Sequence, residues 1–399
     1  PVHLANCDIG RTCGDAGHRQ GAPDRRILPN VLFMFYPHPM PLPPPDPFLR
    51  LRARGASTND PGRFEPYRRA AESDGWDLPE EERLLRTEVS EERPRSVLNP
   101  VASPDVGFDR SVNPYRGCEH GCIYCFARPT HGYLGLSAGL DFETRLVARP
   151  TAPAVLAREI ARKSYVCAPI AFGTNTDPYQ PIEARYRIMR AILGLLSDWN
   201  HPCGIVTKGT LIERDLDILG PMAARGLVRV GISITTLDPA LARRLEPRAP
   251  APARRLATIA ALAAAGVPVR VMVAPLIPVL TDPELERILE AARDAGARGA
   301  SWILLRLPHE VAPLFRDWLD RHEPGRAAHV MARLREMRGG RDYDSEWGRR
   351  MTGEGVHAQL IARRFAVAAR RLGLDGPLPA ADTSRFARPP RAGDQLSLF

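Results

Sequence analysis

Short apolar runs rich in β-branched residues alternate with longer amphipathic segments through the middle of the chain. Runs of this kind, bounded by turn residues, are typical of buried strands. The expected strands cover residues 170–174, 204–207, 228–234, 269–274 and 302–305. Strands that alternate with helices in this way predict a parallel α/β sheet or barrel.

The segments between these runs carry apolar residues at the spacing of amphipathic helices. One helix is predicted to bury a face made of Ile182, Tyr186, Met189, Leu193 and Leu196. Another is predicted after the N-cap candidate Thr281, with Pro283 and Glu284 in its first turn. A later helix, at 354–372, is predicted to bury Val356, Leu360, Ile361, Phe365 and Ala368 beneath an arginine-rich face.

With one more strand beside a cysteine motif, the pattern gives about six βα units. The predicted fold is therefore of the α/β class, a partial (β/α)6 TIM-like barrel with a C-terminal helical extension, since eight units need more chain. We expect a disordered or non-native extension at 1–55, an N-terminal segment at 56–105 and the barrel at 106–308. The helical extension then covers 309–375, and a flexible tail covers 376–399.

Composition narrows the partners and the compartment. Lys plus Arg exceeds Asp plus Glu by nine in 399 residues, which favours an anionic partner such as DNA. The alternative is that an Ala-, Arg- and Pro-rich composition makes the chain basic without a binding role. The odd count of seven cysteines argues for a reducing compartment, and no apolar run approaches the roughly 20 residues that span a bilayer. We expect a cytoplasmic protein that does not bind membranes.

Three of the cysteines, Cys118, Cys122 and Cys125, have the spacing C-x3-C-x2-C. Three thiolates on one short loop can ligate three corners of a cubane iron–sulfur cluster, which leaves the fourth iron open. Gly117 and Gly121 suit the left-handed turns that bring such sulfurs together. The alternatives are chance or a zinc site completed by His120, His131, Cys167 or Cys203.

With Tyr124 before the last cysteine and βα repeats after it, the motif resembles that of the radical S-adenosylmethionine (radical SAM) superfamily. Segments 117–125, 173–183 and 245–248 resemble the branch related to spore photoproduct lyase, described as DNA repair photolyase-like. The resemblance covers about 95–374. It implies a [4Fe-4S] cluster, S-adenosylmethionine on the open iron, and a 5′-deoxyadenosyl radical that abstracts hydrogen. It also implies an electron donor such as flavodoxin or ferredoxin.

The resemblance also implies roles for residues at strand ends, where such folds place their sites. The implied cofactor-binding residues are Tyr124, Gly173, Thr174, Asn175, Ser233, Thr235, Pro275 and Ile277. Asp177 and Glu183 are catalytic candidates that could orient substrate or cofactor. The alternatives are that the small residues only make turns and that Glu183 only favours the start of a helix.

One departure from the branch concerns a thiol. Spore photoproduct lyase uses a cysteine just after the second strand to return a hydrogen atom to its product. Residues 173–177 contain no cysteine here, and Cys167 precedes the expected strand. The departure puts the thymine-lesion reaction in doubt and leaves the radical chemistry untouched.

The chain ends in Gln395, Leu396, Ser397, Leu398 and Phe399. This ending resembles the peptide by which bacterial polymerases and repair proteins bind the replication sliding clamp, where apolar side chains fill a pocket. Three hypotheses follow. The first is a radical enzyme on DNA delivered by the clamp. The second is a radical enzyme on RNA, a peptide or a small molecule, and the third is a non-enzymatic metal protein that binds nucleic acid.

Overall fold

The structure is a computed structural model that describes residues 54–65 and 85–388. The peptide Gln395–Phe399 lies outside the described residues, as does most of the expected extension at 1–55. Arg54 and Gly55, the last residues of that extension, are buried in the fold.

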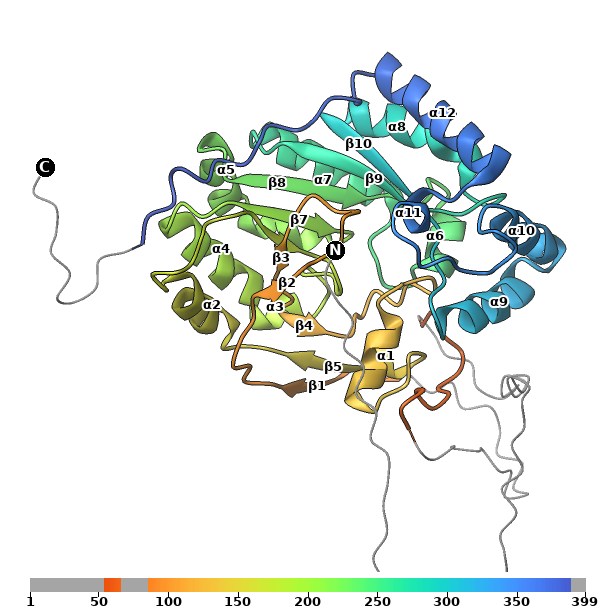
Figure 1. Ribbon diagram of the computed structural model, residues 1–399, viewed down its shortest axis with the longest axis horizontal. Coiled ribbons are helices and arrows are strands. Elements are labelled where there is room, and N and C mark those ends of the chain that lie inside the picture. Colours follow the sequence, from red (N-terminus) through yellow and green to blue (C-terminus); the bar gives the residue numbers. More distant parts are fainter. Residues whose placement is uncertain (1–53, 66–84, 389–399) are drawn as a thin grey trace, which may run out of the picture. The chain divides into compact units, whose positions relative to one another are not determined.

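The main sheet has seven strands in the order β10-β9-β8-β7-β6-β3-β2 (Figure 1). Its strands are β2 (Asn99–Pro100), β3 (Arg110–Ser111), β6 (Ile170–Phe172), β7 (Cys203–Thr207), β8 (Val228–Ser233), β9 (Val269–Leu276) and β10 (Gly299–Leu304). Each neighbouring pair from β3 to β10 is parallel, and β2 is antiparallel to β3. Six parallel strands with helical crossovers confirm the predicted partial barrel.

The five strands expected from the apolar runs all form, with ends that differ by a few residues. They are detected because strands buried on both faces are nearly continuous in apolar character, as in β8, where five of the six residues are buried. The sixth parallel strand, β3, has only two residues and lies just before the cysteine motif.

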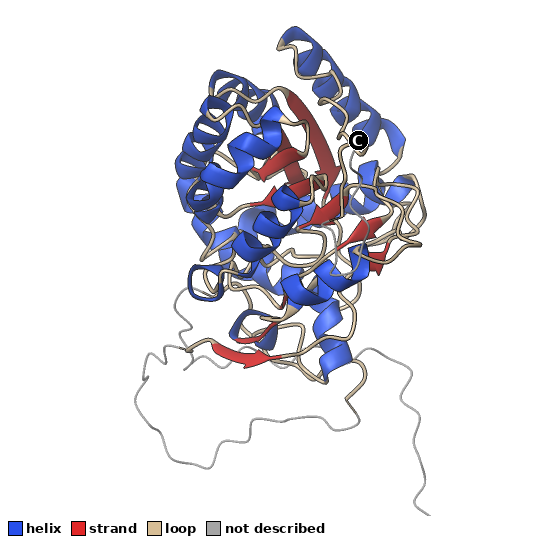
Figure 2. Cartoon of the chain, turned by 90° about the vertical axis from the view of Figure 1, so that its left-hand side faces the viewer, coloured by secondary structure: helices blue, strands red, loops and turns tan. Residues whose placement is uncertain are grey.

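Helices pack along the outside of the strands (Figure 2). They are α2 (Ala152–Ile160), α4 (Ile188–Asp198), α5 (Leu216–Ala224), α7 (Pro252–Ala264) and α8 (Leu285–Asp294). The buried face of α8 is made of Leu285, Ile288, Leu289 and Ala292. This is the face that the apolar spacing predicts. A separate small sheet, in the order β1-β5-β4, comprises β1 (Glu88–Glu91), β4 (Tyr115–Arg116) and β5 (Arg145–Ala148).

The helix expected around Ile182 to Leu196 is broken in two. Arg187 adopts a left-handed conformation (φ 54°) between α3 (Glu183–Tyr186) and α4. The Glu183 carboxylate causes part of this break, because it accepts a hydrogen bond from the backbone N–H of Met189 (3.2 Å) and so caps α4 from outside. The spacing of apolar residues survives the break, which is why the sequence does not reveal it.

Two side-chain expectations for the later helices are wrong. The Thr281 hydroxyl does not cap a helix, because it bonds back to the N–H of Ile277 (2.8 Å) ahead of η3 (Asp282–Glu284) and α8. In α12 (Gly355–Arg371), Val356 and Leu360 are 76% and 50% exposed. The buried face uses Ala358, Ile361, Ala368 and Ala369, because small side chains let α12 approach α8 closely.

The C-terminal extension is helical as expected. It comprises α9 (Val311–His322), α10 (Pro324–Glu336), α11 (Arg349–Thr352) and α12. Residues 376–388, expected to be a flexible tail, instead pack on the barrel: Phe386 contacts the rings of His201 and Tyr165 edge-on. No helix among the described residues is long and apolar enough to cross a membrane.

Candidate iron–sulfur site

The cysteine loop lies between β4 and η1 (Arg128–Leu134). The Cys118 N–H donates to Phe142 (2.9 Å), and the Ile123 N–H donates to the carbonyl of Leu245 (3.0 Å). Gly117 and Gly121 have φ values of 74° and 67°, which confirms the predicted left-handed turns. The loop is therefore held by backbone contacts to parts of the chain that are distant in sequence.

The three thiols share one buried environment. Cys118 and Cys122 are buried and Cys125 is partly buried. Burial raises the pKa of each thiol, and the charge of Asp177, ahead of those of Cys122 and Cys125, raises the pKa of Cys118 further. Three thiols that disfavour ionisation together are stabilised as thiolates by cations, so metal binding would release their protons.

A buried ion pair supports the loop from behind. Arg128 Nη2 lies 2.5 Å from Glu143 Oε1, and neither side chain is exposed. The same guanidinium donates to the carbonyls of Cys122 (Nε, 2.9 Å) and Gly121 (Nη2, 3.2 Å). The sequence interpretation missed this pair, because nothing marks one arginine out of so many in an Arg-rich chain.

Asp177, a predicted catalytic residue, lies where the ends of β6 and β7 meet the cysteine loop. Its carboxylate accepts from Thr207 Oγ1 (2.5 Å) and the Lys208 N–H (2.7 Å), and it is 3.4 Å from Nδ1 of His120. Burial alone would raise the pKa of Asp177, but the charge and hydrogen bond of His120, with those donors, lower it to about 2. Asp177 is therefore a fixed anion beside the thiols.

Tyr124 links the loop to the end of β8. Its hydroxyl donates to the carboxylate of Glu246 and lies 3.1 Å from Thr235 Oγ1. Glu246 also accepts from Arg255, and all four side chains are buried. Burial would raise the pKa of Glu246, but the charges of Arg255 and Lys208 lower it to about 2. The structure thus brings together Tyr124 and Thr235, which the sequence predicts, with Glu246 and Arg255, which it does not.

Lys208 is a second residue that sequence reasoning missed. Its Nζ donates to Ser233 Oγ (2.7 Å) and lies 5.8 Å from the centre of the Tyr124 ring. Lys208 follows the last residue of β7, and Ser233 is the last residue of β8. The partly exposed Lys208 side chain thus holds its ammonium close to the cysteine loop, in a position suited to bind a carboxylate. The sequence feature that could have identified Lys208 is its position directly after the predicted strand 204–207.

The other predicted cofactor-binding residues differ from one another in burial and in the contacts they make. Gly173 directly follows β6, and a Cβ there would lie 1.9 Å from the carbonyl oxygen of Val206. Asn113, just before the cysteine loop, accepts from Thr174 Oγ1 (3.4 Å) and the Asn175 N–H (3.2 Å). Pro275 lies inside β9, and Ile277 follows β9 with no exposed surface.

Glu183 is not grouped with the thiols. One of its oxygens accepts from the Tyr115 hydroxyl, and the other accepts from Arg214 Nη2 (2.7 Å). The side chain is fully buried. Together with its bond to Met189, these contacts favour a structural role for Glu183 over the orientation of substrate.

The ligands proposed for the zinc alternative have other partners. His120 faces Asp177, and His131 Nε2 is 2.9 Å from the carbonyl of Arg145. Cys203 is the first residue of β7, at the opposite end of the strand from Lys208 and the cysteine loop. Within 54–65 and 85–388, no three His, Cys, Asp or Glu side chains are placed to hold a single metal ion. A cubane does not need such a point, because each thiolate binds a different iron.

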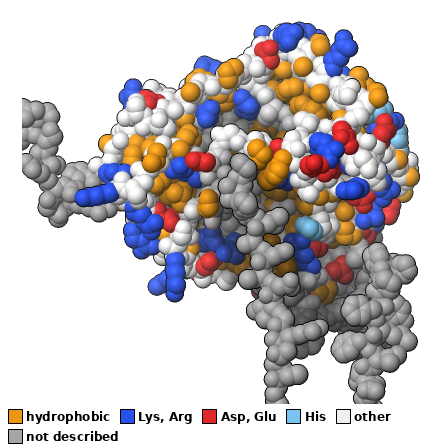
Figure 3. Space-filling view, viewed as in Figure 1, with side chains coloured by type: hydrophobic (Ala, Val, Ile, Leu, Met, Phe, Trp, Pro, Cys, Tyr) orange, Lys and Arg blue, Asp and Glu red, His pale blue; other side chains and the backbone are white. Residues whose placement is uncertain are grey.

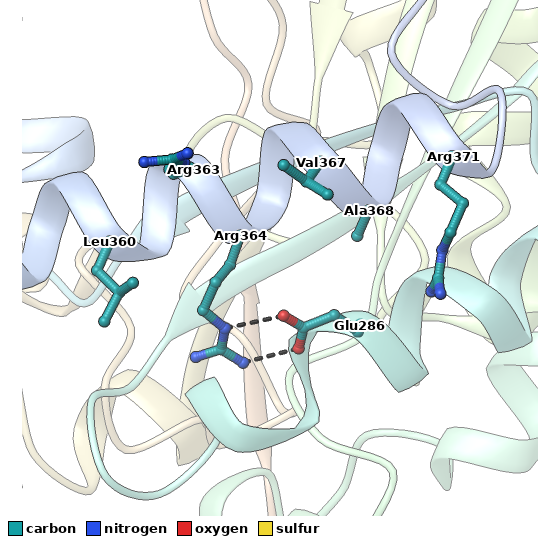
Figure 4. Close-up of a pocket in the computed structure, with 7 residues that line it drawn as sticks. All are labelled: Glu286, Leu360, Arg363, Arg364, Val367, Ala368 and Arg371. Atoms are coloured by element: carbon teal, nitrogen blue, oxygen red, sulfur yellow. Dashed lines mark hydrogen bonds and ion pairs between the residues drawn. The ribbon is translucent and has the colours of Figure 1, made fainter.

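The arrangement therefore fits an iron–sulfur cluster: two buried thiols and one partly buried thiol on a loop held by backbone hydrogen bonds, near the carboxyl ends of parallel strands, with charged groups around them. A shallow pocket elsewhere, between α8 and α12, is lined by Glu286, Leu360, Arg363, Arg364, Val367, Ala368 and Arg371 (Figure 4). Two of its lining residues, Arg364 and Glu286, form an ion pair, and none of the predicted site residues lines it.

Comparisons with known proteins agree with this class of site. Residues 112–292 match the Radical SAM superfamily. An uncharacterized protein of Mycobacterium tuberculosis is 42% identical over 272 residues, which are 67% of this chain and 78% of the relative. An uncharacterized protein of Methanocaldococcus jannaschii is 25% identical over 199 residues, 50% of this chain and 71% of that protein. The chain belongs to the radical SAM superfamily, whose members use an iron–sulfur cluster and S-adenosylmethionine.

Solved structures show the same fold. A variant of spore photoproduct lyase aligns with a TM-score of 0.50 at 16% identity, over 71% of this chain and 79% of that one. Spore photoproduct lyase complexed with a dinucleoside spore photoproduct aligns with a TM-score of 0.50 at 15% identity, with the same coverage. At this identity the likeness concerns the fold, and the substrate has to be argued from the chain itself.

Proposed function

We propose that this enzyme holds a [4Fe-4S] cluster on Cys118, Cys122 and Cys125 and acts on nucleic acid. When bound and reduced, the cluster would supply the electron that cleaves S-adenosylmethionine into methionine and a 5′-deoxyadenosyl radical able to abstract hydrogen from the substrate. The observation that carries the proposal is the position of the three thiols, two of them buried and one partly buried. They adjoin Asp177, Lys208 and Thr235, which follow three neighbouring parallel strands.

The surrounding side chains suit the amino-acid part of S-adenosylmethionine. We assign Lys208 to its carboxylate, because the ammonium is partly exposed and already oriented by Ser233. We assign Thr174 and Asn175, which are held by hydrogen bonds to Asn113, to its amino group. Asp177 keeps its negative charge in the folded protein and orients His120 and the Lys208 backbone rather than transferring a proton.

Aromatic and arginine side chains next to the cluster loop support a nucleic-acid substrate. Phe126, directly after Cys125, is 44% exposed, and the Arg306 guanidinium lies 4.8 Å from its ring centre. Arg306 Nη2 also lies 3.3 Å from the Tyr343 hydroxyl. Exposed rings beside guanidinium groups are the usual platform for unstacked bases. On the face in Figure 3, Lys and Arg side chains are interspersed with Asp and Glu, so the overall basic charge adds little to this argument.

The reaction on that substrate differs from reversal of a thymine lesion by a thiol. Among the described residues, Cys167 and Cys203 are the cysteines outside the cluster loop; Cys167 precedes β6 and Cys203 is the first residue of β7. Both therefore lie at the amino ends of their strands, away from the carboxyl ends that meet the cysteine loop. We propose that the hydrogen atom removed from the substrate is not returned by a cysteine of this barrel.

The experiment that tests the nucleic-acid substrate is isotope transfer. The reduced enzyme is incubated with S-adenosylmethionine and deuterated DNA, RNA or peptide, and the 5′-deoxyadenosine is analysed by mass spectrometry. We expect deuterium in the product with DNA. Deuterium only from RNA, or only from a peptide, would replace the proposed substrate with that class.

We also propose two partners. In the cytoplasm a reduced flavodoxin or ferredoxin supplies the electron, and Gln395, Leu396, Leu398 and Phe399 bind the bacterial sliding clamp. What supports the clamp partner is the pattern of apolar residues in a polar tail. Purified clamp should be retained by the full chain and lost when residues 395–399 are deleted; equal retention by the truncated chain contradicts the proposal.

A further inference from the structure

A short segment far from the cysteine motif in sequence lies directly against it. We call residues 54–59 the N-terminal strap. The Gly55 and Ala56 N–H groups each donate to one oxygen of Glu143 (2.9 Å each), and Arg54 Nη1 donates to the Glu143 carbonyl (2.9 Å). The Glu143 carboxylate, which pairs with Arg128, thus receives further hydrogen bonds from the strap.

The strap packs so closely against the cysteine loop at Gly55 that no side-chain atom fits between them. A Cβ at Gly55 would lie 1.9 Å from the carbonyl oxygen of Gly121, the residue before Cys122. Ala56 is only 2% exposed and belongs to the same buried cluster as Cys122. Real Cβ atoms do not approach a carbonyl so closely, so any larger residue at position 55 must displace the strap or the loop.

The far end of the strap is fixed as well. Asn59 and Asp141 exchange two hydrogen bonds: Asn59 Nδ2 to Asp141 Oδ1 and the Asp141 N–H to Asn59 Oδ1 (2.9 Å each). The Leu140 N–H donates to the carbonyl of Thr58 (3.1 Å). Ser57 Oγ donates to Asp317 of α9 (2.8 Å), which ties the strap to the helical extension.

We infer that the N-terminal strap is a positioning element of the cluster site, which holds the loop from Cys118 to Cys125 in its ligating conformation. The inference deepens the proposed function and rests on it. The Radical SAM match begins at residue 112, so the strap lies outside the part of the chain that matches the superfamily. Through Glu143 and Arg128 it fixes the carbonyls of Gly121 and Cys122, and with them the direction of the Cys122 side chain.

The test uses Gly55→Ala in the full chain, with Gly107→Ala as the matched control. A Cβ at Gly107 meets no atom within 4 Å, so the control makes the same chemical change in open space. Each protein is reconstituted anaerobically with iron and sulfide and passed over a desalting column in the presence of a chelator. Iron and acid-labile sulfide per chain are then measured, together with the melting temperature of the apoprotein and the EPR spectrum of the reduced cluster.

We expect Gly55→Ala to lose more than half of the iron and sulfide retained by the parent. We also expect its residual EPR spectrum to be broadened and its apoprotein melting temperature to stay within a few degrees of the parent's. Gly107→Ala should match the parent in every measurement. Equal retention of iron by Gly55→Ala and the parent overturns the inference but not the proposed function, whereas a parent that retains no cluster overturns both.

A second measurement does not depend on whether the variant folds. Hydrogen exchange at the Gly55 and Ala56 amides is compared in the parent with and without its cluster. Both amides donate to Glu143, so a cluster that rigidifies the loop should slow their exchange. Exchange at the same rate in both forms contradicts a positioning role for the strap.

Discussion

The Tyr124 hydroxyl donates a hydrogen bond to the Glu246 carboxylate. This contact joins the cysteine loop to the residue that directly follows α6 (Pro239–Leu245). Arg255 of α7 binds the same carboxylate. The contact explains why segment 245–248 accompanies the cysteine motif: its glutamate orients the tyrosine between two cluster ligands. A buried charge pair of this kind adds little net stability while it is intact, but removal of one partner destabilises the protein strongly.

Substitution of Glu246 should therefore lower stability. In Glu246→Gln the amide keeps a hydrogen bond to Tyr124 but leaves the buried Arg255 charge unpaired, which should cost about 3 kcal/mol of the free energy of unfolding. The control is Glu213→Gln, which breaks the more exposed Arg254–Glu213 pair and should cost less than about 1 kcal/mol. Urea unfolding of the apoproteins measures both, and equal losses would contradict the account.

Lys208→Gln should weaken the binding of S-adenosylmethionine without loss of the cluster. Loss of one charged hydrogen bond predicts a dissociation constant raised about 10- to 100-fold. Titration of the reduced cluster with S-adenosylmethionine, followed by EPR, gives the constant. Lys163→Gln is the matched control because Lys163 is exposed, and it should bind like the parent. If both variants bind alike, Lys208 does not contact the cofactor.

His201 should make stability depend on pH. Burial lowers the pKa of His201 to about 4, although its hydrogen bond with the Pro202 carbonyl raises it. The folded state then binds fewer protons than the unfolded state, whose histidine pKa is about 6.5, so stability is full above pH ~6.5 and is lost as the pH falls toward ~4. The loss should reach about 3 kcal/mol. In His201→Gln this part of the pH dependence should vanish; an unchanged profile assigns it to other groups.

The corrected face of α12 makes a paired prediction. Ile361 is 3% exposed and Leu360 is 50% exposed, although they are neighbours in sequence. Ile361→Ala should cost about 2–4 kcal/mol of unfolding free energy, and Leu360→Ala should change it by less than about 0.5 kcal/mol. Urea unfolding compares the two. A larger loss for Leu360→Ala would restore the face that the apolar spacing alone predicts.

The strands and the cysteine motif could be predicted because both are local patterns. Buried parallel strands are continuous apolar runs, and the spacing of Cys118, Cys122 and Cys125 lies within eight residues. The face of α12 could be predicted only in part, because Ile361 and Ala368 are buried as expected whereas Val356 and Leu360 are exposed. Val356 and Leu360 are as apolar as Ile361, and only the approach of α8 decides that small alanines face inward.

The supporting charges of the site depend on long-range contacts. Arg128 and Glu143 pair across 15 positions, and Tyr124 reaches Glu246 across 122. Lys208 follows a predicted strand end, so its position could have been inferred. Its pairing with Ser233, however, depends on which strands are neighbours. The role of the strap is harder still to predict from the sequence, because residues 54–59 show no apolar periodicity. Their role depends on the contacts that Gly55 makes with distant residues.

The central claim is that three thiols bind a cluster whose fourth iron takes S-adenosylmethionine. The most direct measurement is the 5′-deoxyadenosine formed per chain after anaerobic reconstitution, reduction with dithionite and addition of S-adenosylmethionine. The account predicts product from the parent and none from Cys122→Ala. It also predicts product from Cys203→Ala, because Cys203 lies at the amino end of β7, away from the cysteine loop. A reconstituted parent that forms no 5′-deoxyadenosine, or a Cys122→Ala variant that forms it at the parent's rate, would contradict it.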